Sequence, residues 1–224
     1  MFQMNDVIWF TSISEKWYLK YGKEYLTTWQ ELPGEKICYV DEPIDNFVDC
    51  FTTVPTTVCL ENTPEPEIYW KTYGTKRKSI KWYLKSRVTS YVLNTLKAKY
   101  LIWVDADVEY LGNLNLEEIF PNDDEVLSTI YKPEGLDSGF VCFNTHHPDF
   151  QKFVKEYESA WYNDMILESQ HPGDAHILEI LNRNYKYKNF FNGNVIRGRR
   201  HVDFFDTSIE NSFIHHVGMA KEKS

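Results

Sequence analysis

The sequence lacks several features that define other classes of protein. Its 224 residues include only 4 cysteines, Cys38, Cys50, Cys59 and Cys142, and no Cys-x-x-Cys pair. We therefore expect buried free thiols in a reducing compartment rather than a disulfide framework or a zinc site. The pattern G-x-x-x-x-G-K-[S/T] is also missing, which excludes a P-loop nucleotide-binding enzyme.

Long apolar segments are missing as well. No uninterrupted run approaches the ~20 apolar residues that a membrane-spanning helix needs. The first residues, Met1–Asp6, lack the basic and apolar regions of a secretory signal peptide. These absences predict a cytoplasmic protein without a transmembrane segment.

Positive charge is not in excess. The chain has 24 basic and 33 acidic residues and a net charge of −9, so no nucleic-acid partner is expected. Basic residues still gather at Lys76–Arg87 and Arg197–Arg200. Such clusters are as compatible with phosphate binding as with a solvated surface.

Aromatic residues, in contrast, are abundant. They make up 16% of the chain and include 7 Trp and 15 Tyr. Trp and Tyr combine apolar faces with hydrogen-bonding groups, as carbohydrate-binding surfaces require, although most of them are expected in the core. With 42% hydrophobic residues, the chain is long and apolar enough for one domain with one continuous core.

Strands and helices alternate in the first half of the chain. Val7–Phe10 and Lys36–Val40 predict strands, separated by a helix over about Glu15–Glu31. A strand, helix and strand in this order indicate a parallel sheet with a right-handed crossover. A second helix is predicted over about Ser79–Lys97, directly before the apolar strand Tyr100–Val104.

The second half of the chain has shorter predicted elements. Strands are predicted near Thr57–Leu60 and at Glu125–Tyr131, Phe140–Phe143, Tyr185–Phe191, Val202–Phe205 and Phe213–His216, and helices within Leu111–Phe120 and at Pro148–Tyr162 and Asp174–Asn182. The connection at Ile68–Lys78 is long enough to be either a functional lid or a disordered loop. The fold class predicted is α/β, a single domain with a mainly parallel sheet flanked by helices. Residues 1–107 would form a nucleotide-binding half and residues 108–224 a half that shapes the sugar and acceptor sites.

Two carboxylates end the most apolar strand. Asp105 and Asp107 follow Tyr100–Val104 directly, at the end of the strand where open α/β sheets gather their ligands. Residues i and i+2 of an extended backbone point the same way, so both carboxylates can face one cation. Hard oxygen donors suit Mg²⁺ or Mn²⁺ bound beside a phosphate. The motif alone is unspecific, because a solvated turn at a strand end has the same composition.

Other polar residues are expected near the same edge of the sheet. Thr11 and Ser12 follow the first strand and are candidates for contacts with a nucleotide, with helix capping as the alternative role. Arg87, within the second helix, can either lean toward this edge or lie on the surface.

Together these segments resemble the GT-A fold glycosyltransferases, which use nucleotide-sugar donors. Asp105-Ala106-Asp107 resembles their D-x-D signature, and Arg87 occupies the place of a donor-binding Arg in the branch of lipopolysaccharide galactosyltransferases and glycogenin. The segment Asp137–Asn144 is similar to the strand that lines the sugar pocket in this family. The resemblance implies that Ser138 and Gly139 contact the donor, whereas Asp137 stands where Asn is more usual.

The end of the chain extends the resemblance. His215–Lys221 is similar to the H-x-x-G-x-x-K element of the family, although Glu222 stands where Pro-Trp usually follows. The resemblance implies that His215 joins Asp105 and Asp107 as a metal ligand and that Lys221 meets the diphosphate. Asp105 could bind either the metal or the ribose hydroxyls of the donor. His216 is the alternative ligand, but the spacing to the lysine favours His215.

Asp174 is the candidate for a carboxylate near the acceptor. It opens a predicted helix after Pro172-Gly173, so a role as helix N-cap is the alternative. In an inverting transfer Asp174 would be the general base, and in a retaining transfer it would position the sugar or the acceptor. The resemblance at His215–Lys221 slightly favours retention.

The function expected is a metal-dependent glycosyltransferase that moves a sugar from a nucleotide-diphosphate donor, expected to be a UDP-sugar, to a glycan or other hydroxyl acceptor. Mn²⁺ is favoured over Mg²⁺ by the mixed oxygen and nitrogen donors. One alternative is a nucleotidyltransferase of NDP-sugar synthesis, but Thr11–Ser14 lacks the glycine-rich loop expected there. The other is a non-enzymatic carbohydrate-binding protein, which would need no metal.

Overall fold

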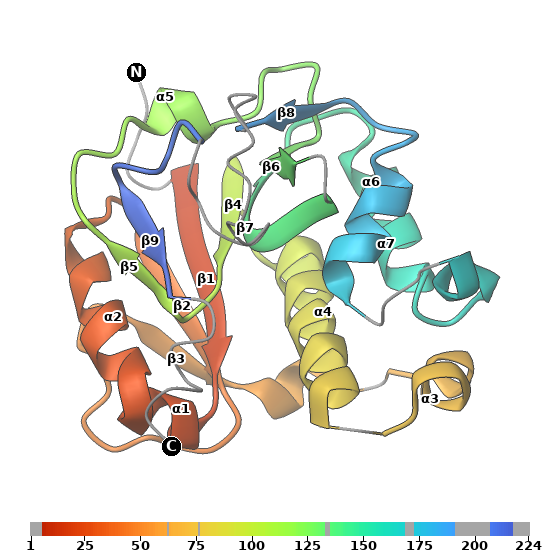
Figure 1. Ribbon diagram of the computed structural model, residues 1–224, viewed down its shortest axis with the longest axis horizontal. Coiled ribbons are helices and arrows are strands. Elements are labelled where there is room, and N and C mark those ends of the chain that lie inside the picture. The colour runs from red at the N-terminus through yellow and green to blue at the C-terminus, as the bar shows by residue number, and fades with distance from the viewer. Residues whose placement is uncertain are drawn as a thin grey trace.

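A seven-stranded mixed sheet forms the centre of the computed structural model, which describes residues 6–61, 63–75, 77–132, 135–168, 173–190 and 207–216 (Figure 1). Its strands are β1 (Val7–Ile13), β2 (Glu35–Val40), β3 (Thr52–Pro55), β4 (Tyr100–Val104), β6 (Leu127–Lys132), β7 (Gly135–Asn144) and β8 (Tyr187–Asn189). They are arranged in the order β3-β2-β1-β4-β7-β6-β8. Strand β7 is antiparallel to its neighbours β4 and β6, whereas β1 to β4 are mutually parallel and β6 is parallel to β8.

Helices cover both faces of this sheet (Figure 1). One helical run follows β1 and consists of α1 (Glu15–Trp17), the π-helical turn η2 (Tyr18–Gly22), α2 (Lys23–Thr28) and the 3₁₀ turn η3 (Trp29–Glu31). The remaining helices are η4 (Thr56–Cys59), α3 (Glu67–Tyr73), α4 (Arg77–Thr95), α5 (Leu116–Ile119), α6 (Phe150–Ser159), η5 (Asp164–Glu168) and α7 (Asp174–Leu181). Helices α4, α6 and α7 pack against one another.

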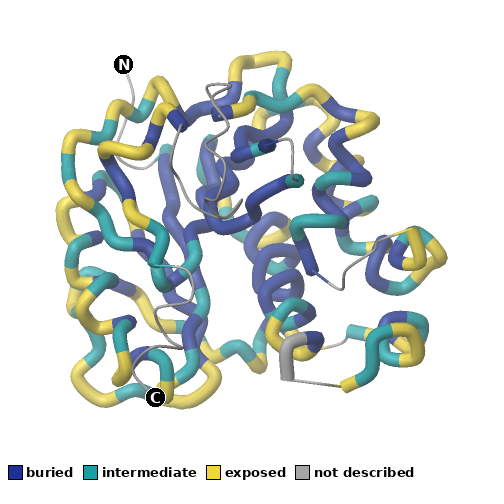
Figure 2. The backbone as a smooth tube through the Cα atoms, viewed as in Figure 1, coloured by how far each residue is buried: buried dark blue, intermediate teal, exposed yellow. Residues whose placement is uncertain are grey.

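The sheet separates two hydrophobic cores. On β1, Ile8 and Phe10 face the core that α4, α6 and α7 cover, while Trp9 faces the other core together with Leu26 and Trp29. This alternation is the one that a strand buried on both faces requires. Figure 2 shows the result as buried strands and a buried α4 beneath a more exposed outer layer.

A second, two-stranded sheet lies beside α2. It pairs β5 (Val108–Tyr110) with β9 (Phe213–His215) in antiparallel register, with Val108 opposite His215. The pairing brings a segment near the end of the chain next to the residues that follow β4.

The predicted fold class is confirmed, and two local predictions are wrong. The segment near Thr57–Leu60 is not a strand, because the edge strand β3 comes earlier and the 3₁₀ turn η4 follows it. The stretch Ile68–Lys78 was expected as a loop but contains most of helix α3. That helix forms because Tyr69 is fully buried, with its ring 5.2 Å from the ring of Trp161. The predicted strand Val202–Phe205 lies outside the described residues.

Two further features concern the thiols and the length of the helices. All four cysteines are free, and Cys38, Cys59 and Cys142 are buried. Among the described residues, no helix has both the length and the apolar character needed to cross a membrane.

Candidate functional site

The D-x-D segment turns away from the sheet at the carboxyl end of β4. The backbone N–H of Asp105 donates to the carbonyl of Gly139 at 2.9 Å, and the N–H of Val108 donates to the carbonyl of Asp105 at 3.0 Å. The N–H of His216 in turn donates to the carbonyl of Asp107 at 3.0 Å. Because β7 is antiparallel to β4, its first residues lie at this same edge. Segments from β4, β7 and β9 therefore meet at one place.

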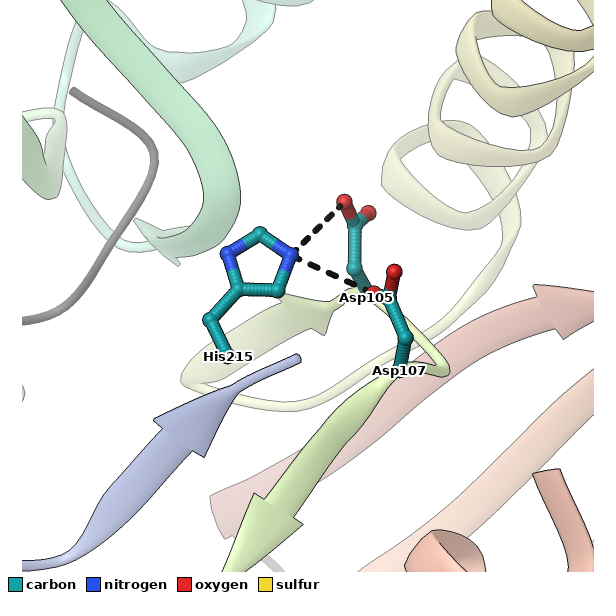
Figure 3. Close-up of side chains that lie close together, drawn as sticks. All are labelled: Asp105, Asp107 and His215. Carbon is teal, nitrogen blue, oxygen red and sulfur yellow. Dashed lines mark ion pairs between the residues drawn. The ribbon is translucent and has the colours of Figure 1, made fainter. Parts of the chain in front are cut away.

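Asp105, Asp107 and His215 form a cluster there (Figure 3). The His215 Nε2 lies 3.2 Å from the Asp107 Oδ1 and 3.8 Å from the Asp105 Oδ2. One possible ligand atom from each residue lies within 4.8 Å of the others. Two carboxylate oxygens and one imidazole nitrogen are a donor set that suits Mn²⁺ or Mg²⁺, so these residues fit a divalent cation.

The neighbours of these side chains shift their pKa values strongly. Burial alone would lower the pKa of His215, but the hydrogen bond and charge of Asp107, with Asp137 and Asp105 beside them, raise it to about 9. Burial alone would raise the pKa of Asp105, but the charges of Lys85 and His215 lower it to about 2. A cation that binds to His215 must therefore displace a proton from the imidazole.

His215, the last residue of β9, and His216, which follows it, contact different partners. His216 places its Nε2 2.8 Å from the Glu109 carboxylate, and its ring stacks on Tyr25 with the centroids 4.3 Å apart. Of these two residues, it is His215 that the structure brings to Asp105 and Asp107.

Lys85 joins the cluster from helix α4, although nothing in the sequence analysis pointed to this residue. The Lys85 Nζ donates to the Asp105 Oδ1 at 2.8 Å and to both the carbonyl and the hydroxyl of Ser138, at 2.9 and 3.1 Å. It also lies 3.1 Å from the Asp174 Oδ2. Burial would lower the pKa of Lys85, but the carboxylates of Asp105 and Asp174 raise it above its ordinary value. The side chain is thus a buried, charged ammonium between two carboxylates.

Asp174 is the first residue of helix α7, with Gly173 as the N-cap. Its side chain is buried and forms an ion pair with Lys85. The structure thus brings the predicted acceptor-side carboxylate to the D-x-D segment, with Lys85 between them.

Arg87 lies two residues after Lys85, and its guanidinium has other partners. Its Nη1 donates to Glu158 at 3.0 Å and to the hydroxyl of Tyr162 at 3.2 Å. These contacts join α4 to α6 and the turn after it. The structure does not bring Arg87 to the carboxylate cluster, whereas it does bring Lys85 there.

The other predicted donor-binding residues have different surroundings. Thr11 is completely buried within β1, two residues before its end, whereas Ser12 is half-buried. Ser138 and Gly139 lie beside the cluster through Lys85 and Asp105. Lys221 and the basic segment Arg197–Arg200 lie outside the described residues.

The fold is that of the GT-A glycosyltransferases. The structure of the galactosyltransferase LgtC in complex with donor and acceptor sugar analogues aligns with a TM-score of 0.56, 12% sequence identity, and coverage of 95% of this chain and 88% of LgtC. An active-site mutant of LgtC aligns with the same TM-score and identity, over 94% and 87% of the two chains. No protein-family profile and no curated protein sequence matches the chain. The predicted resemblance to this fold is confirmed from the structure, at an identity too low to define the reaction.

Proposed function

We propose that this protein is a metal-dependent glycosyltransferase that transfers a sugar from a nucleotide-diphosphate donor to a hydroxyl group of a glycan or another acceptor. The observation that carries the proposal is the cluster of Asp105, Asp107 and His215 at the carboxyl edge of a GT-A sheet. A divalent cation held by these residues would neutralise charge that develops on the leaving diphosphate. The mixed donor set favours Mn²⁺ over Mg²⁺.

The residues around the cluster suit the other requirements of the transfer. The ammonium of Lys85 adds a fixed positive charge beside Asp105, where a departing phosphate would need it. Asp174 is committed to its ion pair with Lys85, which suits a role in positioning the sugar or the acceptor. This role agrees with a retaining transfer, the outcome that we favour. Lys221 remains a proposed ligand of the diphosphate.

A UDP-sugar is the proposed donor, and Ser12, Ser138 and Gly139 are the proposed donor contacts beside the metal ligands. Thr11 is a weaker candidate, because its hydroxyl is buried inside the sheet. A non-enzymatic carbohydrate-binding role would leave the ion-paired cluster of Lys85, Asp105 and Asp174 without a purpose, so we favour the enzyme.

The test is hydrolysis of UDP- and GDP-sugars without an acceptor, with Mn²⁺ or with EDTA. We expect one donor to be cleaved only with the metal, and Asp107→Ala to lower this rate by about 10²-fold or more. The matched control is Asp124→Ala. This variant removes an exposed carboxylate that pairs with Lys186. Binding of no nucleotide sugar, with Asp107→Ala indistinguishable from the wild type, would refute the proposal.

A further inference from the structure

The two nitrogens of His215 face different carboxylates. Its Nε2 edge faces Asp105 and Asp107, whereas its Nδ1 lies 4.0 Å from the Oδ2 of Asp137. Asp137 belongs to β7 and is only 3% exposed. The imidazole therefore lies between the proposed metal ligands on one side and a buried carboxylate on the other.

The carboxylate of Asp137 is held in place by its own strand. Its Oδ1 accepts a hydrogen bond of 2.8 Å from the backbone N–H of Gly139. Its Oδ2 accepts no hydrogen bond from the part of the chain that the structure describes. This oxygen is the one that lies 4.0 Å from the Nδ1 of His215, so it has unused acceptor capacity beside the ring.

Gly139 lies directly against the imidazole ring of His215. A Cβ atom on Gly139 would lie 2.7 Å from the Cε1 and 3.1 Å from the Nδ1 of His215. The ring thus packs directly on the backbone of β7, at the edge that Asp137 faces. Asp137 and Gly139 thus both lie beside the imidazole of His215 and limit its orientation.

A buried carboxylate oxygen without a hydrogen-bond donor lowers the stability of the fold, so its presence calls for an explanation. Histidines that bind a metal through one nitrogen usually donate the N–H of the other nitrogen to a carboxylate or a carbonyl. That bond fixes the tautomer and the orientation of the ring, and losing it typically weakens metal affinity by 10–100-fold.

We propose that Asp137 is a positioning residue for His215. Its carboxylate keeps the proton on Nδ1 and directs the lone pair of Nε2 toward a cation held by Asp105 and Asp107. This inference rests on the proposed metal site, and it assigns Asp137 to the metal rather than to the sugar.

The test is Mn²⁺ affinity of the full chain, measured from the electron paramagnetic resonance signal of free Mn²⁺ with UDP present. The variant Asp137→Asn keeps the shape of the side chain and removes its charge, and we expect it to weaken Mn²⁺ binding by about 10–100-fold. Glu109→Gln is the matched control, because it removes a carboxylate that binds the neighbouring His216 instead. We expect this control to keep the wild-type affinity.

A second measurement separates positioning from a structural role. In the Mg²⁺ form, the imidazole ¹⁵N shifts of His215 should show a single tautomer protonated at Nδ1, and Asp137→Asn should lose it without lowering the thermal midpoint. Wild-type Mn²⁺ affinity in Asp137→Asn, with only the KM for the donor changed, would overturn the inference and assign Asp137 to the sugar. If the wild type itself binds no Mn²⁺, both this inference and the proposed metal site fail.

Discussion

Gly139 sets how closely the imidazole of His215 can approach the sheet. The change Gly139→Ala places a methyl group within 2.7 Å of the ring, and His215 has to move because the backbone of β7 cannot. We expect Mn²⁺ affinity to fall by about 10-fold or more, as for the loss of other groups that orient metal ligands. Titration with Mn²⁺ measures this effect.

Gly173 offers a matched control for that substitution. Its φ is −96°, and apart from its chain neighbours no atom of the described residues lies within 4 Å of a Cβ placed there. We expect Gly173→Ala to bind Mn²⁺ as the wild type does. Equal losses in the two variants would mean that the effect is not specific to His215.

The charge state of His215 makes metal binding depend on pH. Its pKa of about 9 in the folded chain lies above its ordinary value of 6.5, so the ring carries a proton that the cation must displace at neutral pH. We expect the affinity for the cation to rise between pH 7 and pH 8.5, by up to about tenfold per pH unit for one released proton, and to level off above pH 9.

Calorimetric titration with Mg²⁺ in buffers of different ionisation enthalpy measures the released proton directly. The variant His215→Gln has no such proton, so its weaker binding should vary less with pH over the same range. A wild-type affinity that is constant from pH 7 to pH 8.5 would contradict the assignment of His215 as a ligand.

At the scale of elements, helix α4 shows where sequence reasoning reached its limit. The helix itself was predicted nearly at its observed bounds, because no Gly or Pro interrupts it. Lys85 was missed because a lysine inside a basic run reads as a solvated side chain. Its burial follows from the packing of α4 against β4, α6 and α7, which the tertiary structure decides.

Lys85 and Arg87, two of the basic residues of α4, should give opposite results on substitution. Lys85→Gln removes the charge between Asp105 and Asp174, and we expect kcat for donor hydrolysis to fall by about 10²–10³-fold. Arg87→Gln breaks contacts with Glu158 and Tyr162, and we expect it to cost about 1–3 kcal/mol of stability while kcat changes little.

Donor hydrolysis kinetics and thermal unfolding of both variants distinguish these effects. If Arg87→Gln raises the KM for the donor and keeps its thermal midpoint, then Arg87 is the donor-binding residue that the sequence suggested. Lys85 would in that case be a structural lysine.

At the scale of the whole molecule, the sequence predicted the class of fold but not all of its strand pairings. The long apolar strands were found because each is buried on both faces. The reversed direction of β7 and the pairing of β5 with β9 were not found. The short strand β5 was not predicted, because three residues carry little periodicity, and pairing between distant segments leaves no local signal in one sequence.

Metal binding should stabilise the whole domain. A ligand that binds only the folded chain adds about 2.7 kcal/mol of stability at a concentration of about 100 times its Kd. For a chain of this length, we expect Mn²⁺ to raise the thermal midpoint by several degrees. Asp107→Ala should remove this shift, which differential scanning calorimetry measures. An equal shift in the variant would mean that Mn²⁺ binds elsewhere.

The pairing of β5 with β9 also has a consequence for how the protein reaches its folded state. The two strands are separated by more of the chain than most partners in the main sheet, and closing so long a loop is slow and entropically costly. We therefore expect His215 to be among the last parts of the molecule to assemble. A cation that joins it to Asp105 and Asp107 would clamp this late segment to the finished sheet, so catalytic competence and completion of folding would coincide.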